Sequence, residues 1–539
     1  MTTSNWLTLN EAGDAIRLTI DGRVHELPIS WHIRGETIPA SDVVTGKKRA
    51  AATLAGQMVD GRVKLEHADS EARITMRASL KRSQTLGINE LGFSLRLPPG
   101  TSVWASQRRF TEADTPVGTS LANYFTYGCL KAVMFEIDEK SLLFACKWAV
   151  GKAFTAGTIE RDRRGWTLHW RWEPKAPFAR AVDEMPPASF GFFASSVEAA
   201  KDYQRWIAAE YGLVPRAESL AIPSWFHDVR CVIGLWMKTN DGTVVHDYGD
   251  VQRLLEEMKR LGVGPNTTLY LLGWDGAYGV RHGYFEPDDE LGGTSGLQKA
   301  CAMASQLGYR VMVHASLYLV DKTTELFRRF LDASIRDGYY REAHWPYSQQ
   351  ECYAMPVPIG LLNPAHGAYR EDRLNRLMRV LQLGVDGLMY DSIDGQPNDP
   401  IHGDTHAGNV AIYEALRRAH PECVQTCETP TERVFPFMAG FALGAALDAM
   451  QVGERRARGG GVYDFEPYKA MTQPTHYLFA HDGGFPLAVD RPGSRYNDVP
   501  ENFDRMIELQ RQRDDFRCVQ LNYRQYGIDE KAKEIILGR

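Results

Sequence analysis

The stretch that decides the fold is Gly384-Val385-Asp386-Gly387-Leu388-Met389-Tyr390-Asp391-Ser392-Ile393-Asp394-Gly395. Its short apolar run ends abruptly in the carboxylate of Asp391, and turn residues follow at once. This pattern is typical of a buried parallel strand that delivers an acid to the mouth of a barrel. It recurs at Cys423-Val424-Gln425-Thr426-Cys427-Glu428, where a second short strand also ends in an acid. The two carboxylates are therefore expected at the same face of one sheet.

Strand and helix patterns alternate from residue 223 onward. Strands are predicted at 229–236, 268–274, 309–314, 385–390, 423–427 and 476–482, with a doubtful one at 445–450 and a closing helix at 501–513. Such alternation favours a parallel α/β domain, and a closed (β/α)₈ TIM barrel is the commonest solution at this size. An eighth strand is not visible in the sequence, so closure is inferred.

Residues 1–195 follow a different period. Segments such as Ala15–Ile20, Gly92–Leu97 and Trp166–Trp172 alternate apolar and polar residues, which predicts antiparallel sheets packed as a β-sandwich. The period becomes helical from Ser196, and prolines then mark a linker. The expected organisation is a β-sandwich over 1–195, a helical linker over 196–222, and a barrel with a C-terminal helical segment over 223–539.

Composition narrows the class of protein. The 539 residues are 44% apolar and 24% charged, which indicates a globular chain of two or three domains. The net charge of -6 gives no excess of positive charge with which to bind nucleic acid. No apolar run is long enough to span a membrane and no signal peptide is visible, so we expect no membrane partner and a cytoplasmic location. The eight scattered cysteines fit buried free thiols in a reducing compartment, although a non-classical export route stays open.

Polar residues gather where the predicted strands end, and parallel barrel strands share one carboxyl face. Asp391 and Glu428 form the candidate catalytic pair. The candidate ligand contacts are Trp274, Asp275, His314, Tyr390, Asp394, His402, Arg455, His481 and Asp482. Structural alternatives stay open for several of them, since an Asp after a strand often caps the next helix and a Trp or His often packs in a core.

The loop His402-Gly403-Asp404-Thr405-His406 resembles a metal-ligand cluster, but its spacing fits no closed zinc pattern. We favour a turn or a substrate-contacting loop there, and expect neither a metal nor a cofactor. The glycines at 459–461 follow Arg455, and a basic lid and a plain surface loop fit them equally. The sequence has no Gly-x-Ser-x-Gly elbow and no Gly-x-Gly-x-x-Gly after a strand, which argues against esterase and nicotinamide chemistry.

At these residues the chain resembles a family of glycoside-hydrolase-like (β/α)₈-barrel proteins. The resemblance is carried by Leu271–Asp275, Tyr284–Pro287, Leu291–Gly293, Leu307–Val311 and Gly384–Asp391. That family is similar to the retaining α-glycosidases of the α-galactosidase superfamily, including endo-α-N-acetylgalactosaminidases. The resemblance implies a β-sandwich before the barrel, Asp391 as nucleophile and Glu428 as acid/base. One departure is His314, where an amide such as Asn is expected.

These features together predict a retaining α-glycosidase that acts on a carbohydrate or glycoside. Its two carboxyl groups should lie about 5–5.5 Å apart, and Glu428 should start protonated. A metal-assisted sugar isomerase or lyase on the same barrel is one alternative, hinted at by His402, Asp404 and His406. A carbohydrate-binding protein without activity is another. The sugar, its linkage, exo or endo action and the oligomeric state stay open.

Overall fold

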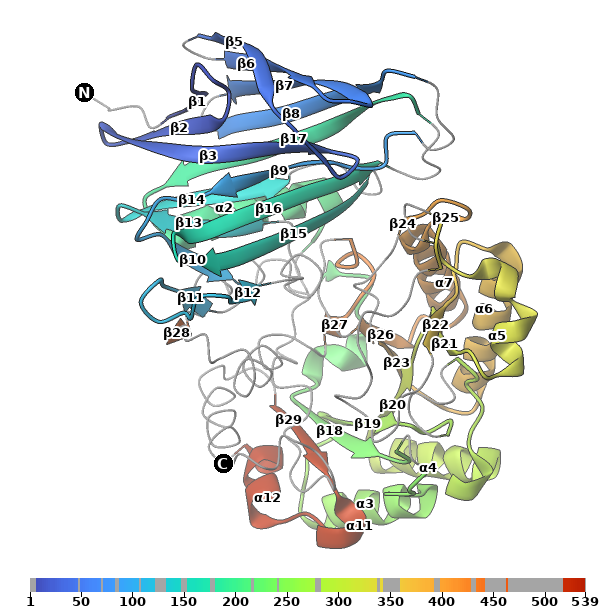
Figure 1. Ribbon diagram of the computed structural model, residues 1–539. Coiled ribbons are helices and arrows are strands. Elements are labelled where there is room, and N and C mark those ends of the chain that lie inside the picture. The colour runs from blue at the N-terminus through green and yellow to red at the C-terminus, as the bar shows by residue number, and fades with distance from the viewer. Residues whose placement is uncertain are drawn as a thin grey trace.

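The computed structural model in Figure 1 describes most of the chain. The described residues are 6–46, 49–68, 71–82, 87–105, 108–121, 132–146, 153–174, 180–214, 218–239, 242–276, 283–336, 340–342, 359–391, 398–427, 433–441, 462–463 and 517–538.

The N-terminal region contains two antiparallel sheets. The first has eight strands in the order β1-β2-β3-β9-β16-β15-β12, with β4 on β3. Their bounds are β1 Trp6–Leu9, β2 Ala15–Ile20, β3 Arg23–Ile33, β4 Glu36–Ile38, β9 Leu91–Arg96, β12 Ser120–Leu121, β15 Ala153–Asp162 and β16 Gly165–Pro174.

The second sheet has ten strands in the order β28-β11-β10-β13-β14-β17-β8-β7-β6-β5. Their bounds are β5 Ala40–Thr45, β6 Arg49–Ala55, β7 Val59–Ala68, β8 Glu71–Leu80, β10 Ser102–Ala105, β11 Arg108–Phe110, β13 Ala132–Ile137, β14 Lys140–Cys146, β17 Val182–Phe193 and β28 Val462–Tyr463. Strand β28 lies far along the chain from its partner β11.

The two sheets share one apolar core. Strands such as β6 and β8 bury every second residue, because successive side chains on a strand point to opposite faces. Phe93 of the first sheet meets Phe144 of the second edge to face, with ring centres 5.9 Å apart. This packing of two sheets is a β-sandwich, as the alternation predicted.

A seven-stranded parallel sheet follows, in the order β27-β26-β23-β20-β19-β18-β29. Its bounds are β18 Cys231–Trp236, β19 Thr267–Leu272, β20 Arg310–Ala315, β23 Gly387–Tyr390, β26 Val424–Cys427, β27 Gly440–Phe441 and β29 Arg517–Leu521. Every residue of β18, β19, β23 and β26 is buried, which is typical of parallel strands covered on both faces.

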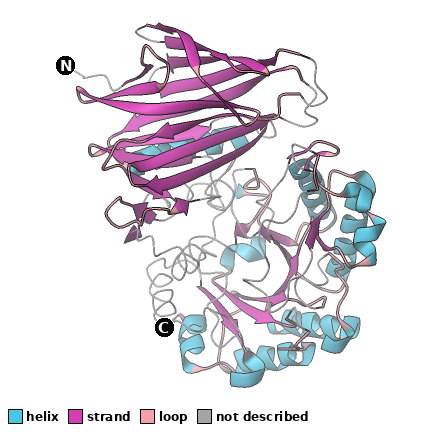
Figure 2. Ribbon diagram, viewed as in Figure 1, coloured by secondary structure: helices cyan, strands magenta, loops and turns pink. Residues whose placement is uncertain are grey.

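Helices cover the outside of this sheet (Figure 2). They are α3 Tyr248–Arg260, α4 Gly293–Leu307, α5 Glu325–Arg329, α6 Gly367–Gln382, α7 Thr405–Ala419, α11 Tyr523–Tyr526 and α12 Glu530–Leu537. Short 3₁₀ helices are η2 Ser224–Asp228, η3 Asp289–Leu291 and η4 Leu331–Ala333, and two small hairpins pair β21 Leu319–Asp321 with β22 Ile359–Leu361 and β24 Asn398–Asp399 with β25 Gly403–Asp404. No helix in the described part of the chain is long and apolar enough to span a membrane.

Helix α2, Ser196–Tyr211, joins the two regions. It begins where the helical period was predicted, with the Ser195 side chain accepting from the Glu198 amide as an N-cap. Its Ala200, Tyr203 and Ile207 belong to the same apolar cluster as the parallel sheet, and Trp104 of the sandwich belongs to that cluster too. The two regions therefore share buried surface at this helix.

The mixed α/β class is confirmed, and closure of the barrel stays a prediction. Two strands of the described parallel sheet were not predicted from the sequence. One is β27, which pairs with β26, and the other is β29, which pairs with β18 along Cys231–Leu235. The predicted strands at 445–450 and 476–482 and the helix at 501–513 lie outside the described residues.

Candidate functional site

The register of the parallel sheet decides which side chains share a face. His314 of β20 pairs with Met389 of β23, and Met389 pairs with Thr426 of β26. Paired positions in parallel strands point to the same side, and the next residue along each strand points to the other. Tyr390 therefore lies on the opposite side from His314, and Asp391, two residues after Met389, lies on the same side.

Asp391 and His314 form a buried pair at the carboxyl end of the sheet. The Asp391 amide donates to the Ala315 carbonyl at 2.7 Å, which continues the ladder for one residue beyond β23. Oδ2 of Asp391 lies 3.5 Å from Nε2 of His314, and the two side chains are only 7% and 6% exposed. The imidazole of His314 therefore restrains the orientation of the Asp391 carboxylate at this end of the sheet.

Trp274 and Asp275 follow strand β19, which lies next to β20 in the sheet. Trp274 is fully buried, and its indole N–H donates to the His314 carbonyl at 2.8 Å. The Tyr248 hydroxyl donates in turn to the Trp274 carbonyl at 2.7 Å. This ring thus holds the end of β20 in place and does not offer a face for stacking on a sugar. Asp275 is half-buried, and its Oδ2 accepts from the Phe285 amide at 3.2 Å.

Tyr390 is placed away from Asp391, contrary to its expected role as a ligand contact. Its hydroxyl donates to Oε1 of Gln425 at 2.7 Å, and the Gln425 amide donates to the Tyr413 carbonyl of α7 at 3.0 Å. Its ring also lies 5.1 Å from that of Tyr413. Burial raises the pKa of Tyr390 far above its usual range. Tyr390 consequently fills the layer between the sheet and α7.

The loop at His402–His406 spreads its polar groups among different partners. Nε2 of His402 lies 2.7 Å from the Asp332 carbonyl, and its ring packs edge to face on His366. Asp404 caps α7 by accepting from the His406 amide, and it also pairs with Arg433. No group of three His, Cys, Asp or Glu side chains within the described ranges is arranged to hold a metal ion.

The remaining predicted site residues are Glu428, Asp394, Arg455, His481 and Asp482, and all five lie outside the described residues. Strand β26 ends at Cys427, the residue before Glu428 in the sequence, and Cys427 pairs with Tyr390. Glu428 therefore follows its strand by the same interval as Asp391 follows β23.

Sequence reasoning missed two polar residues that share the face of His314. Tyr270 of β19 is buried, and its ring centre lies 6.5 Å from that of His314. Thr426 of β26 is fully buried beside Met389. Tyr270 lies four residues before Trp274, and Thr426 lies two residues before Glu428. Residues separated by an even number along a strand share a face, so a known register would have predicted both.

The comparisons with known proteins bear on the fold. No protein-family model matches the sequence, and no curated protein matches it. The α-N-acetylgalactosaminidase NagBb from Bifidobacterium bifidum, in complex with GalNAc, is similar over 95% of this chain and 92% of its own, with a TM-score of 0.71 and 12% identity. The same enzyme with Gal-NHAc-DNJ is similar over 89% and 82%, with a TM-score of 0.69 and 12% identity.

The GH36 α-galactosidase AgaB from Geobacillus stearothermophilus is similar over 94% of this chain and 74% of its own, with 10% identity and a TM-score of 0.49. NagBb, the neighbour with TM-scores of 0.71 and 0.69, is an α-N-acetylgalactosaminidase and therefore a glycoside hydrolase. The expected resemblance to glycoside-hydrolase-like proteins is therefore confirmed for the fold.

Proposed function

We propose that this chain is a glycoside hydrolase that cleaves an α-glycosidic bond with retention of configuration. Asp391 is the nucleophile and Glu428 the acid/base. The observation that carries the proposal is the buried pair of Asp391 and His314 at the carboxyl end of a central parallel strand, on a fold shared with an α-N-acetylgalactosaminidase. Barrel enzymes build their sites at this face.

The proposal includes a closed barrel preceded by the sandwich. Among the described strands, β29 pairs with β18 and forms one edge of the parallel sheet. Strand β27 forms the opposite edge. Closure needs a further strand from the segment between β27 and β29. We retain the divisions 1–195, 196–222 and 223–539 as the sandwich, linker and barrel.

In the proposed mechanism Asp391 attacks the anomeric carbon while Glu428 gives its proton to the leaving oxygen. A water molecule, deprotonated by Glu428, then hydrolyses the glycosyl-enzyme. His314, whose imidazole lies beside the carboxylate of Asp391, orients Asp391 before attack. Because the neighbour NagBb is described in complex with GalNAc, an aryl α-N-acetylgalactosaminide is the first substrate to try.

The test uses this substrate with an activated leaving group. Asp391→Ala should lower turnover by several orders of magnitude, because no other group forms the glycosyl-enzyme. Glu428→Ala should retain activity on activated leaving groups, and azide should rescue it to give an α-glycosyl azide of retained configuration. An inverted azide product would reject Asp391 as nucleophile. Sugar binding without hydrolysis of any aryl α-glycoside would favour a carbohydrate-binding protein.

A further inference from the structure

Phe285 adopts a backbone conformation that side-chain-bearing residues rarely use. Its φ is 55°, and its ring is buried. Non-glycine residues in this left-handed region are strained, so they persist where their surroundings hold them. In this conformation the Phe285 amide donates to Oδ2 of Asp275 at 3.2 Å. The strained residue thus orients an acid at the mouth of the candidate site.

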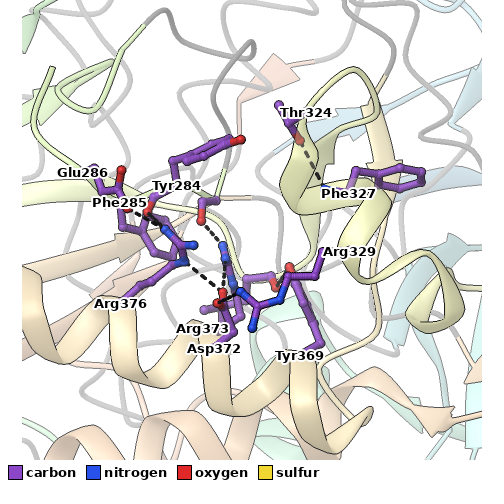
Figure 3. A network of polar contacts seen from close by, with 12 residues as sticks. Tyr284, Phe285, Glu286, Thr324, Phe327, Arg329, Tyr369, Asp372, Arg373 and Arg376 are labelled. Atoms are coloured by element: carbon purple, nitrogen blue, oxygen red, sulfur yellow. Dashed lines mark hydrogen bonds and ion pairs between the residues drawn. The ribbon is translucent and has the colours of Figure 1, made fainter.

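The first group that holds this loop is Arg373 of α6, which is fully buried. Figure 3 shows Arg373 and its neighbours in this network of polar contacts. Its guanidinium donates to the Gly283 carbonyl and, at 2.6 Å, to Oδ2 of Asp372. It also lies 5.2 Å from the ring centre of Phe285, within the range of a cation–π contact. Arg373 therefore contacts the loop on both its backbone and its aromatic side chain.

The second group is Arg376, one helical turn further along α6. Its guanidinium donates to the Tyr284 carbonyl at 3.0 Å and to Oε1 of Glu286 at 2.8 Å. Its Nε donates to Asp372 at 2.9 Å. Hydrogen bonds from a charged donor are about twice as strong as neutral ones. Two consecutive loop residues, Tyr284 and Phe285, are thereby fixed from one helix.

Asp372 ties the two arginines together. Burial disfavours its ionised form, but the guanidiniums of Arg373 and Arg376 outweigh this and lower the pKa of the Asp372 carboxyl. A buried ion cluster is costly compared with apolar packing, and its usual benefit is a defined geometry. Helix α6 leads through residues 383–386 into β23, which ends at Tyr390, the residue before Asp391. The ion cluster therefore joins helix α6, which precedes β23, to the loop at Phe285, whose amide contacts Asp275.

We propose that Arg373 and Arg376 are positioning residues that hold Asp275 at the mouth of the site through the backbone of Phe285. The first, structural half of this inference is that the arginines hold the loop, which does not depend on activity. The second, catalytic half is that this hold matters for hydrolysis, and it rests on the proposed function and on the expected contact of Asp275 with the sugar. Different measurements test the two halves, so a failure of either can be recognised.

The structural half is tested by hydrogen exchange of the amides at 283–286 in the full chain. Arg376→Ala and Asp275→Ala should each speed exchange of the Phe285 amide about tenfold or more, because each removes part of what holds it. Arg329→Ala is the matched control, since Arg329 lies 3.8 Å from Asp372 and is 65% exposed. It should leave the exchange unchanged. Unchanged exchange in Arg376→Ala would overturn the inference.

The catalytic half is tested by a double-mutant cycle on hydrolysis of the aryl glycoside. Arg376→Ala should lower kcat/KM about 10- to 100-fold, because a small misplacement of a contacting group is costly. In the Asp275→Ala background the same change should have less than about a twofold effect, since it acts through Asp275. Fully additive effects would overturn the positioning role.

Arg376→Lys guards against a variant that merely fails to fold. Lysine keeps the charge but cannot reproduce the guanidinium fork, so kcat/KM should fall between wild type and Arg376→Ala at an unchanged Tm. A loss of Tm with wild-type kcat/KM would show a purely structural role. If wild type hydrolyses no aryl α-glycoside, the proposed function fails, and the exchange experiment still decides whether the arginines hold the loop.

Discussion

The phenolic oxygen of Tyr390 lies 2.7 Å from Oε1 of Gln425, on the face of the parallel sheet that packs against α7. The next residue, Asp391, lies on the other face beside His314. Two adjacent residues of one motif therefore face opposite sides of the sheet. Tyr390 packs against α7, and Asp391 lies on the side where we propose that the chemistry occurs.

Tyr390→Phe should reduce stability without reducing activity. The change removes one buried hydrogen bond and leaves Oε1 of Gln425 short of a donor, which costs about 1–3 kcal/mol in the free energy of unfolding. Urea unfolding measures the loss, and kcat/KM on the aryl glycoside should stay at the wild-type value. A large drop in kcat/KM at an unchanged free energy of unfolding would place Tyr390 in the site after all.

His314→Ala should impair catalysis more than folding. The change removes the group that faces Asp391, and misorientation of this proposed nucleophile should lower kcat about 10- to 100-fold. His314→Gln keeps an N–H donor and should lie between the alanine variant and wild type. Steady-state kinetics at constant pH measure both. Equal kcat values for all three proteins would show that the contact with Asp391 has no catalytic role.

Gly273→Ala should destabilise the chain and disturb the site together. Gly273 has a φ of 65°, and an added Cβ would lie 2.3 Å from the Lys238 carbonyl oxygen. The backbone would have to shift, and Trp274 and Asp275 follow directly, so we expect a loss above about 2 kcal/mol and a lower kcat/KM.

Gly262→Ala is the matched control for this change. Gly262 has a similar φ of 72°, but its added Cβ would meet no atom within 4 Å. Only the backbone strain should remain, at about 1 kcal/mol. Equal effects of the two substitutions on thermal unfolding would mean that the close approach to Lys238 is relieved at no cost.

Buried His246 should make the chain less stable in mild acid. Burial lowers its pKa, and Arg524 adds to this, although the Trp236 carbonyl, Asp250 and Asp247 act in the opposite direction. The unfolded chain then binds the proton more readily, with a pKa of about 6.5. The stabilisation from neutral His246 is fully present above that value and is lost as the pH falls from there toward the folded pKa.

The measurement is the free energy of unfolding at a series of pH values for wild type and His246→Gln. The variant cannot titrate at this position, so its stability should fall less steeply below about pH 6.5. Parallel curves for the two proteins would show that His246 takes up its proton equally well in the folded chain.

Much of the architecture follows from local patterns. The sequence shows the buried run before Asp391 and the alternation within β6 and β8. Both patterns depend only on the order of apolar and polar residues close together in the chain. The same holds for the start of α2, where the Ser195 cap and the apolar spacing coincide. By itself the sequence therefore determined the order of a sandwich, a connecting helix and a parallel α/β region, and an acid at the end of a central strand.

Only the tertiary structure decided which side chains meet. The pairing of β29 with β18, the turning of Tyr390 toward α7, and the hold of Arg373 on the loop of Phe285 all join segments far apart in the chain. A strand shows its period but not its register, and a shift of one residue moves every side chain to the other face. The contact between His314 and Asp391 depends on that register, so it emerged only when β20 and β23 were paired.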